Sequence, residues 1–465
     1  VMRSADRTYF GRFKEGSLES PFAGNLTDIC PTGVYTDKPS RFFGRRWDFE
    51  RSPAICINCS LGCHSVVSFR YREARRQEAR FSPVVNGHFI CDRGRYGLFY
   101  NGLDSRPRST LANGSEISVG EGRQQAHRRL QQLLEEAGPS AAAVVGSTRS
   151  SLETQAMLKH FCQANKLDDP VFFMDQARSV KAKSAAARLD SELAISMQEI
   201  ENADCIVVVG ADPINEAPML ALAMRQAQRN GAAVAVLDPR PISLPLEFAH
   251  LPVSLDAIGF TAGMLIKAAV DSAAAAGGGE GAAKFYQSAP DENLAEAPYR
   301  QVISAITHDL KGSSRPVIVC GTDIVPPQIP GLSADLALLL QAAGKKAGLF
   351  FVLPGANAFG SILVADAQKS FLQIIEGIEG GEIKALILAE SDPFSEFADR
   401  KRLDQAMDQL ELLIVMDYLK TEAVNRAHLF LPTATIYETG GLFVKQEGRL
   451  QVAVQAYRGG LPIVQ

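Results

Sequence analysis

Apolar residues in the middle of the chain form short continuous runs separated by segments with helical spacing. CIVVVGADP (205–213) and AAVAVLDPR (232–240) are continuous runs, whereas APMLALAMRQAQRNG (217–231) places its apolar residues on one helical face and ends at Gly231. Strands that are apolar on both sides are typical of parallel sheets covered by helices. The pattern predicts a β-loop-α-β unit whose loop lies at the carboxyl end of the first strand, where doubly wound folds bind ligands.

A weaker copy of this pattern lies towards the carboxyl end of the sequence. ALILAESDP (385–393) and ELLIVMDY (411–418) read as buried strands joined by a helix over 401–410. Further upstream, residues 141–146 predict a strand and Ser151 caps a predicted helix. Two related α/β lobes are the economical interpretation. The segment SAAAAGGGEGAA (272–283), which is small and flexible, is expected to be a surface loop or hinge.

Length and composition are those of a globular protein of several domains. The chain has 465 residues, of which 46% are hydrophobic and 22% are charged. No apolar run approaches the ~20 residues of a membrane span. The start of the sequence does not resemble a signal peptide. We therefore expect a soluble chain on the reducing side of a membrane.

Half of the eight cysteines are crowded into one short segment, where Cys56, Cys59, Cys63 and Cys91 read C-x2-C-x3-C-x27-C. Three ligands from a tight loop and a fourth from a distant turn suit a [4Fe-4S] cubane. Structural zinc usually takes two C-x2-C knuckles, and no second knuckle is present. Zinc and unrelated buried thiols remain the alternatives. Gly62 and Gly94 are expected to let the backbone close around the cluster and to aim amides at its sulfurs.

Arginine is concentrated around these cysteines. Residues 41–108 hold thirteen Arg, no Lys and six acidic residues, a net charge of +7, whereas residues 109–465 have a net charge of −11. Cationic neighbours stabilise the reduced form of an anionic cluster and can steer an acidic partner. Arg93, two positions after Cys91, is the candidate for a direct role, whereas residues 72–80 can equally be a solvated face. The acidic chain and the lack of a recognition motif argue against nucleic-acid binding.

Three further residues carry weaker signals. Cys30 precedes Pro31, as the last ligand of a bacterial ferredoxin motif does, yet residues 1–29 contain no other cysteine. Read alone, Cys30 is better explained as a buried thiol. His64 is expected to be a packing or surface residue, with tuning of a cluster as the alternative. Trp47 is expected to anchor its segment against the core.

The cysteine-rich sequence is similar to that of a known family. The segment from YFGRFKEGSLES through DICPTGVYTDKP and AICINCSLGCHS to NGHFICDRGRYG (9–97) resembles the large iron-sulfur subunit of bacterial NADH:quinone oxidoreductase, respiratory complex I. The resemblance implies that Cys30 is the fourth ligand of an upstream [4Fe-4S] cluster whose three other ligands precede this sequence. It also implies that a [2Fe-2S] centre belongs to a missing amino-terminal part.

The resemblance assigns the other cysteines as well. Cys56, Cys59, Cys63 and Cys91 match an additional [4Fe-4S] motif found in some members of the family and at the front of molybdenum and tungsten enzymes. In those enzymes a basic residue just after the fourth cysteine, here Arg93, relays electrons to a pterin. In complex I this cluster is regarded as lying off the main electron path, which implies an inherited, structural centre.

The carboxyl-terminal part resembles a second signature. AHLFLPTATIYETGGLFVKQEGRLQ (427–451) is similar to the string LP…E..G…N.EGR of molybdopterin oxidoreductases. The metal-ligand loop of active members corresponds here to residues 171–190, which lack cysteine and offer only Ser179 and Ser184. Cys162, Cys205 and Cys320 are predicted to be core thiols. We therefore expect the fold to be retained, with no molybdopterin and no catalytic residue.

These observations predict an α/β protein: a small iron-sulfur domain followed by two Rossmann-like parallel-sheet lobes of the molybdopterin oxidoreductase fold. The expected domains are 1–50, the remnant of an upstream ferredoxin-like domain with its linker; 51–108, the [4Fe-4S] domain; and 109–465, the two lobes, truncated at the carboxyl end.

The resemblance further implies an electron-transfer and scaffold subunit in the peripheral arm of NADH:quinone oxidoreductase, on the cytoplasmic side of the bacterial inner membrane. Its expected partners are the NADH/FMN-binding, [2Fe-2S] and quinone-module subunits. The alternative is a catalytic molybdenum- or tungsten-pterin oxidoreductase such as formate dehydrogenase.

Overall fold

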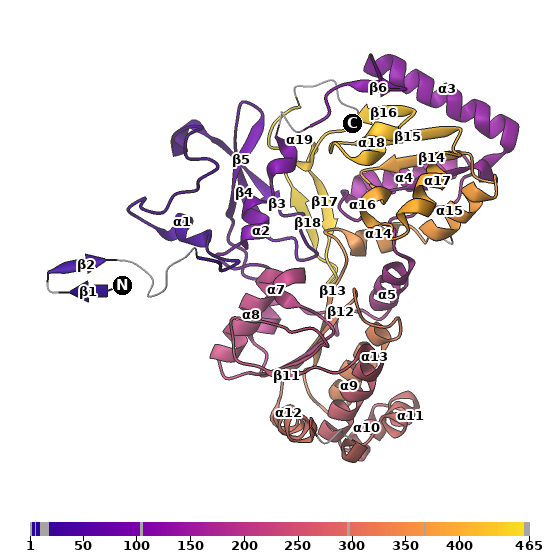
Figure 1. The fold of residues 1–465 in the computed structure, drawn as a ribbon. Helices are drawn as coiled ribbons and strands as arrows, with labels where there is room; N and C mark the ends of the chain where they lie inside the picture. Colours follow the sequence, from indigo (N-terminus) through magenta and orange to yellow (C-terminus); the bar gives the residue numbers. More distant parts are fainter. Residues whose placement is uncertain are drawn as a thin grey trace.

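The computed structural model describes residues 2–4, 6–9, 18–102, 106–294, 298–366 and 369–459. In Figure 1 residues 50–102 form a violet, cysteine-rich unit to the left of an upper and a lower α/β lobe. A short antiparallel pair, β1 (Met2–Ser4) and β2 (Arg7–Tyr9), lies at the amino-terminal side. Residues 10–17, which are part of the segment that carries the family resemblance, lie outside the described residues.

The cysteine-rich unit, residues 50–102, is built on a three-stranded antiparallel sheet. Its strands are β3 (Glu50–Ile55), β4 (His64–Arg70) and β5 (Glu73–Ala79). Helix α2 (Asp92–Tyr96) follows the sheet, and α1 (Asn25–Ile29) precedes it. The loop between β3 and β4 holds three of the cysteines, and α2 begins at the fourth.

The lower lobe contains a parallel sheet of five strands in the order β11-β10-β9-β12-β13. The strands are β9 (Cys205–Val209), β10 (Ala233–Leu237), β11 (Ala249–Leu251), β12 (Pro316–Gly321) and β13 (Gly348–Val352). The helices of this part are α6 (Met197–Glu201), α7 (Pro213–Glu216), α8 (Pro218–Arg229), α9 (Leu255–Ala269), α10 (Ser272–Gly277), α11 (Glu280–Ser288), α12 (Arg300–Gly312) and α13 (Ile329–Ala342). The strand order reverses between β9 and β12, so their carboxyl ends form a topological switch point.

The upper lobe contains a sheet of six strands in the order β7-β6-β16-β15-β14-β8. The strands are β6 (Thr110–Ala112), β7 (Ser115–Ile117), β8 (Ala142–Val145), β14 (Ala385–Ala389), β15 (Leu412–Asp417) and β16 (Leu429–Pro432). Its helices, with those that join the lobes, are α3 (Val119–Ala137), α4 (Leu152–Ala164), α5 (Gln176–Ala187), α14 (Ala358–Val364), α15 (Phe371–Glu379), α16 (Pro393–Glu396), α17 (Arg400–Met407), α18 (Glu422–Arg426) and α19 (Ile436–Thr439). The strands from β16 to β8 are parallel.

The central strands are buried on both faces, as their continuous apolar sequences predict. Every residue of β9, β12 and β14 is buried. Along β9, Cys205, Val207 and Val209 face one apolar core, whereas Ile206 and Val208 face a second core that also contains the cysteine-rich loop. The predicted α/β class with parallel sheets is therefore confirmed, and the cysteine-rich unit packs on the same core as the lower sheet.

One feature differs from the sequence prediction, and a second is a pairing that the sequence does not predict. Most of residues 272–283 is helical and not a loop, because 272–277 form α10 and 280–283 begin α11. The alanines favour helix, and Ala275 is fully buried. In addition, β8 pairs with β14, although the lower lobe lies between them in the sequence. The upper sheet is thus assembled from segments on both sides of the lower lobe.

An antiparallel hairpin, β17 (Gly441–Val444) and β18 (Leu450–Ala453), runs between the three parts in Figure 1. Its end bonds to the cysteine-rich unit, where the Val454 amide donates to the Pro53 carbonyl over 3.2 Å. Its turn bonds to the lower lobe, where the Phe351 amide donates to Gln446 Oε1 over 2.7 Å. The hairpin therefore connects the cysteine-rich unit with the lower lobe.

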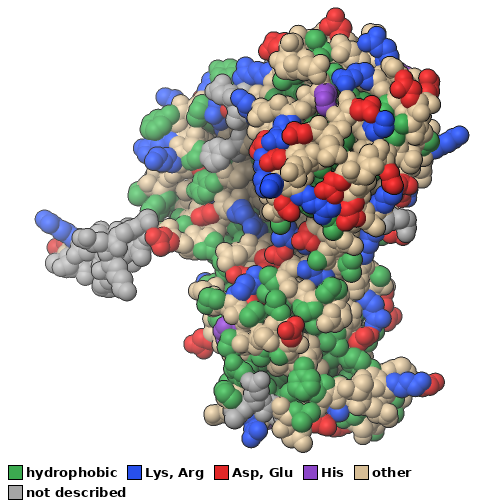
Figure 2. All heavy atoms as spheres, turned by 45° about the vertical axis from the view of Figure 1, so that its right-hand side comes forward, with side chains coloured by type: hydrophobic (Ala, Val, Ile, Leu, Met, Phe, Trp, Pro, Cys, Tyr) green, Lys and Arg blue, Asp and Glu red, His purple; other side chains and the backbone are tan. Residues whose placement is uncertain are grey.

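Charged side chains of both signs are mixed over the upper lobe in the view of Figure 2. Ion pairs occur within this lobe, where Arg402 contacts Glu379 over 2.7 Å and Arg426 contacts Asp404 over 2.8 Å. None of the helices in the described ranges combines the length and the apolarity that a bilayer crossing requires.

Candidate metal centre

The four cysteines of the C-x2-C-x3-C-x27-C motif come from three neighbouring elements. Cys56 directly follows β3, Cys63 directly precedes β4, and the Cys56 amide donates to the Cys63 carbonyl over 2.9 Å. Cys59 lies in the loop that this bond closes, and Cys91 is the N-cap of α2. Cys56, Cys63 and Cys91 are buried, whereas Cys59 is partly exposed. The fold therefore brings the two distant parts of the motif together.

The thiols interact electrostatically. Burial raises the pKa of Cys56, Cys63 and Cys91, and the neighbouring thiolates raise each of these pKa values further. Buried thiols that lie this close together stay protonated and neutral unless nearby cations stabilise their thiolates. Within the described ranges, no three His, Cys, Asp or Glu side chains are gathered tightly enough to hold a single metal ion.

The surroundings of the thiols fit an iron-sulfur cluster. Gly62 adopts φ +57°, which favours glycine. At Gly94 a Cβ would lie 3.1 Å from Cys56 Sγ, and the Gly94 amide donates to Cys91 Sγ over 3.4 Å. Among the described residues, Gln451 Oε1 and Nε2 and His64 Nε2 are buried without a hydrogen-bond partner. Close backbone approach, an amide aimed at a sulfur and free polar atoms agree with such a group.

Two cations flank the thiols. The exposed Arg93 donates to the carbonyls of Asn215 and Glu216, each over 2.8 Å, and its charge lowers the pKa of Cys56 and Cys91. Because α7 follows β9, Arg93 ties the cysteine-rich unit to the switch point of the lower sheet. Lys445, in the turn of the β17–β18 hairpin, lowers the pKa of Cys63. Cysteine spacing does not single out Lys445, although this residue occupies the position that the signature LP…E..G…N.EGR writes as Asn.

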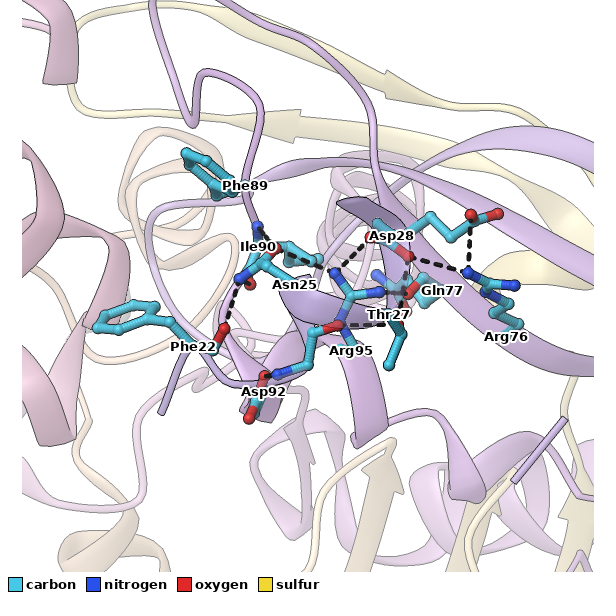
Figure 3. Close-up of polar contacts among 12 residues, drawn as sticks. Phe22, Asn25, Thr27, Asp28, Arg76, Gln77, Phe89, Ile90, Asp92 and Arg95 are labelled. Carbon is cyan, nitrogen blue, oxygen red and sulfur yellow. Dashed lines mark hydrogen bonds and ion pairs between the residues drawn. The ribbon is translucent and has the colours of Figure 1, made fainter. Parts of the chain in front are cut away.

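A buried arginine holds α1 against this unit, as Figure 3 shows. The Arg95 side chain is 1% exposed and contacts Asp28 over 2.6 Å and Asn25 Oδ1 over 3.0 Å. Asn25 in turn accepts from the Ile90 amide next to Cys91. Arg76 reaches the same Asp28 over 2.9 Å. Of the arginines in 72–80, Arg76 thus has a structural role.

The structure places Cys30 apart from the other four cysteines. Cys30 ends α1 and lines a surface hollow of about 310 Å³ that contains no other cysteine among its described lining residues. Hydrogen bonds from the Tyr35 backbone and the Thr32 hydroxyl lower the pKa of its thiol to about 7. Cys30 is only partly exposed, and it remains the predicted ligand of a separate centre.

The structure tests the predicted burial of three cysteines and of Trp47. Cys162, Cys205 and Cys320 are at most 2% exposed, so they are core thiols as predicted. Trp47 is 76% exposed and stacks with Arg45, so the prediction that it anchors its segment in the core is wrong. The residue type of a single tryptophan does not show whether its side chain faces the protein interior or the solvent. Burial and the charge of Arg80 lower the pKa of His64 to about 4.

A cavity of about 500 Å³ lies at the carboxyl edge of the upper sheet. Ile57 of the cysteine loop, Met157, Glu390 and Tyr418 are among its lining residues. Arg149 enters this edge and contacts Asp417 over 2.8 Å. Ser179 and Ser184 lie on α5, outside this lining, and no cysteine is among the described residues that line it.

Known proteins share the sequence and the fold. Residues 124–459 match the molybdopterin oxidoreductase family, and residues 1–36 match the ferredoxin-like domain of NADH-quinone oxidoreductase subunit 3. The G subunit of NADH-quinone oxidoreductase from Pseudomonas fluorescens is 32% identical over 475 residues, covering 98% of this chain and 51% of that protein. The corresponding Shigella flexneri protein is 30% identical over 470 residues, with the same coverage.

The chain thus spans about half the length of these curated relatives. Acetylene hydratase from Pelobacter acetylenicus shares the fold with a TM-score of 0.65 and 12% identity, over 89% of this chain and 67% of that structure. Because the family match extends over most of the residues that form the two lobes, the chain belongs to the molybdopterin oxidoreductase family.

Proposed function

We propose that this chain is an electron-transfer and scaffold part of the large iron-sulfur subunit in the peripheral arm of NADH:quinone oxidoreductase. The observation that carries the proposal is the cysteine quartet, which is largely buried and lies beside two cations. The similarity to the G subunit of that enzyme extends over 98% of the chain and supports the assignment. When bound, a [4Fe-4S] cluster supplies one-electron storage and transfer.

The residues of the chain have distinct roles in this proposal. Cys56, Cys59, Cys63 and Cys91 would hold the cluster as thiolates, and the Gly94 amide is already directed at Cys91 Sγ. Arg93 keeps the unit at the switch point of the lower sheet through the carbonyls of Asn215 and Glu216. The apolar core that the loop shares with β9 limits access of water to the sulfurs.

We infer a second role for Cys30 as the last ligand of a different [4Fe-4S] cluster. Its place within residues 1–36, which match a ferredoxin-like domain, supports this role. The lowered pKa of its thiol favours the thiolate that ligation requires. The remaining ligands, and a [2Fe-2S] centre, would belong to sequence outside this chain.

The proposed partners are the other peripheral-arm subunits: those that bind NADH and FMN, the [2Fe-2S] subunit and those of the quinone module. The proposed location is the cytoplasmic face of the bacterial inner membrane. The net charge of +7 over residues 41–108 suits an acidic protein surface.

The cavity beside Ile57 favours a second candidate function, catalysis on a pterin-bound molybdenum or tungsten. Its volume is in the range of small-molecule sites. Against this candidate, the two serines considered as metal ligands lie on α5 and outside the cavity lining. We therefore propose that the family fold is retained here without its metal chemistry.

Metal and pterin analysis distinguishes the candidates. The intact complex, purified without oxygen, is assayed for iron, acid-labile sulfide, molybdenum, tungsten, zinc and pterin. We expect iron and sulfide without molybdenum, tungsten or pterin. Stoichiometric pterin with molybdenum or tungsten would establish the second candidate, and zinc without sulfide would contradict both.

A further inference from the structure

Lys445 is a buried ammonium group without a carboxylate partner. It follows β17 directly and is 4% exposed, and its Nζ donates to the Ala356 carbonyl over 2.6 Å. Within the part of the chain that the structure describes, no Asp or Glu forms an ion pair with it. Burying a positive charge in this position is costly unless a nearby negative group compensates it.

The cysteine loop supplies most of the negative groups that act on Lys445, and Glu447 is the other. At Gly62 a Cβ would lie 2.2 Å from Lys445 Cε and 2.3 Å from Nζ, so the side chain lies directly against the loop. Burial lowers the pKa of Lys445 to about 8. The thiolate of Cys59 opposes this shift most, followed by Glu447 and then by the thiolates of Cys63 and Cys56. Glycine at position 62 permits this approach, because any side chain there would displace the ammonium.

The position of Lys445 differs from that of Arg93. Arg93 is exposed, and its guanidinium is engaged by two backbone carbonyls. The Lys445 ammonium has one carbonyl partner and is enclosed by protein. Charges interact more strongly in such a low-dielectric environment than at a hydrated surface. Of the two cations, Lys445 is therefore the one that acts on the thiols from a buried position, where it lowers the pKa of Cys63.

We propose that Lys445 is the buried counter-charge of the centre held by Cys56, Cys59, Cys63 and Cys91, and that it raises the reduction potential of that centre. The inference rests on the proposed function. One added electron makes the site more negative by one charge, and the nearby ammonium stabilises that state. Lys445 is a positioning residue in this account, since it acts on the centre through charge and is not one of its ligands.

A reductive titration followed by low-temperature EPR tests this role in the intact complex. We expect Lys445→Met to shift the midpoint potential of this cluster to a more negative value, and Lys445→Arg to restore it towards that of the unmodified protein. The control is Lys384→Met, which removes a partly exposed lysine that pairs with Glu411 over 2.8 Å and should leave the midpoint unchanged. An unchanged midpoint in Lys445→Met would overturn the inference.

A second measurement uses the unmodified sequence and does not depend on whether the variants assemble. Residues 41–108 contain no lysine, so a lysine nitrogen that couples to this cluster must come from elsewhere in the fold. With lysine labelled with ¹⁵N at Nζ, we expect pulsed EPR on the signal of this cluster to show a ¹⁵N coupling. A cluster signal without that coupling would overturn the role of Lys445. No cluster signal at all would instead contradict the proposed function.

Discussion

At the scale of single residues, the site depends on buried polar groups that satisfy one another. Arg95 illustrates this dependence, since its guanidinium bonds to Asp28 and Asn25 of α1 while its helix starts at Cys91. The same group therefore links the segment that ends in Cys30 with the segment that presents the fourth thiol. Removing one partner of such a pair leaves an uncompensated charge in the interior.

Substituting Arg95 tests that link. We expect Arg95→Met to lower the free energy of local opening of residues 18–102 by roughly 1–3 kcal/mol, because Asp28 keeps its pair with Arg76 but loses its buried partner, and Asn25 Oδ1 loses a donor. Native-state hydrogen exchange measures this energy. The control is Arg402→Met, whose pair with Glu379 is about one-third exposed on both sides and whose loss should cost less than ~1 kcal/mol in its own segment. Equal losses in the two variants would contradict the account.

Glu390 predicts a pH dependence of the upper lobe. Burial raises the pKa of this carboxyl from 4.5 to about 7, although Arg149 opposes the shift and Asp417 adds to it. The folded state therefore holds the proton more tightly than the unfolded chain does. The resulting stabilisation is complete below about pH 4.5 and is lost as the pH rises through about 7.

The variant Glu390→Gln stays neutral and lacks this titration. Because the carboxyl lines a cavity and Glu390 is partly exposed, we expect the wild type to lose roughly 1–3 kcal/mol relative to the variant between pH 5 and pH 8. Thermal unfolding across this range measures the difference. Parallel profiles for the two proteins would show that Glu390 ionises at an ordinary pH.

The sequence alone identifies some of these residues and not others. Cysteine spacing is a local pattern, so Cys56, Cys59, Cys63 and Cys91 can be selected without a structure. Lys445 is more than 350 positions from Cys91 in the sequence, and only the folded hairpin places it against Gly62. Trp47 is a residue that the sequence singles out wrongly. Its residue type predicts burial, but its side chain is exposed.

At the scale of elements, the lower lobe depends on close contact between the carboxyl ends of β9 and β12. At Gly321 a Cβ would lie 2.0 Å from the Gly210 carbonyl oxygen and 2.8 Å from its carbon. Both neighbours are backbone atoms, which cannot rotate away as a side chain can. These ends form the edge to which Arg93 attaches the cysteine-rich unit.

We expect Gly321→Ala to destabilise the lower lobe by roughly 1–3 kcal/mol, because the strands must separate to admit the methyl group. Hydrogen exchange of the β9 and β12 amides reports the effect. Gly312→Ala is the matched control: Gly312 is the last residue of α12 and has no atom within 4 Å of the added Cβ. Alanine there should be neutral or stabilise by up to ~1 kcal/mol. Equal amide hydrogen exchange in the two variants would show that the close approach of Gly321 to Gly210 does not limit the stability of the lobe.

Local patterns predict the elements better than they predict their pairing. The buried strands over 205–209 and 385–389 and the helix capped by Ser151 occur as their sequences indicate. Strand order cannot be inferred in this way, because β8 pairs with β14 across more than 200 positions of sequence. The helices over 272–277 and 280–288 are not predicted by composition, because the glycines of this segment indicate flexibility whereas its alanines favour helix.

At the scale of the whole molecule, the cysteine-rich unit and the two lobes depend on one another. The cysteine loop shares an apolar core with β9, the β17–β18 hairpin reaches the loop through Lys445, and Arg93 binds the switch point of the lower sheet. Such an arrangement suits a scaffold that holds a redox centre at a fixed place.

The central claim is that the four thiols of the motif hold one iron-sulfur cluster. Low-temperature EPR of the reduced, intact complex tests this claim most directly when the wild type is compared with Cys59→Ser and with Cys162→Ala, in which a core thiol is removed. We predict that Cys59→Ser removes one cluster signal and loosens the cysteine-rich unit while the α/β lobes stay folded, and that Cys162→Ala keeps every signal. A Cys59→Ser complex that assembles with an unaltered cluster spectrum would contradict the account.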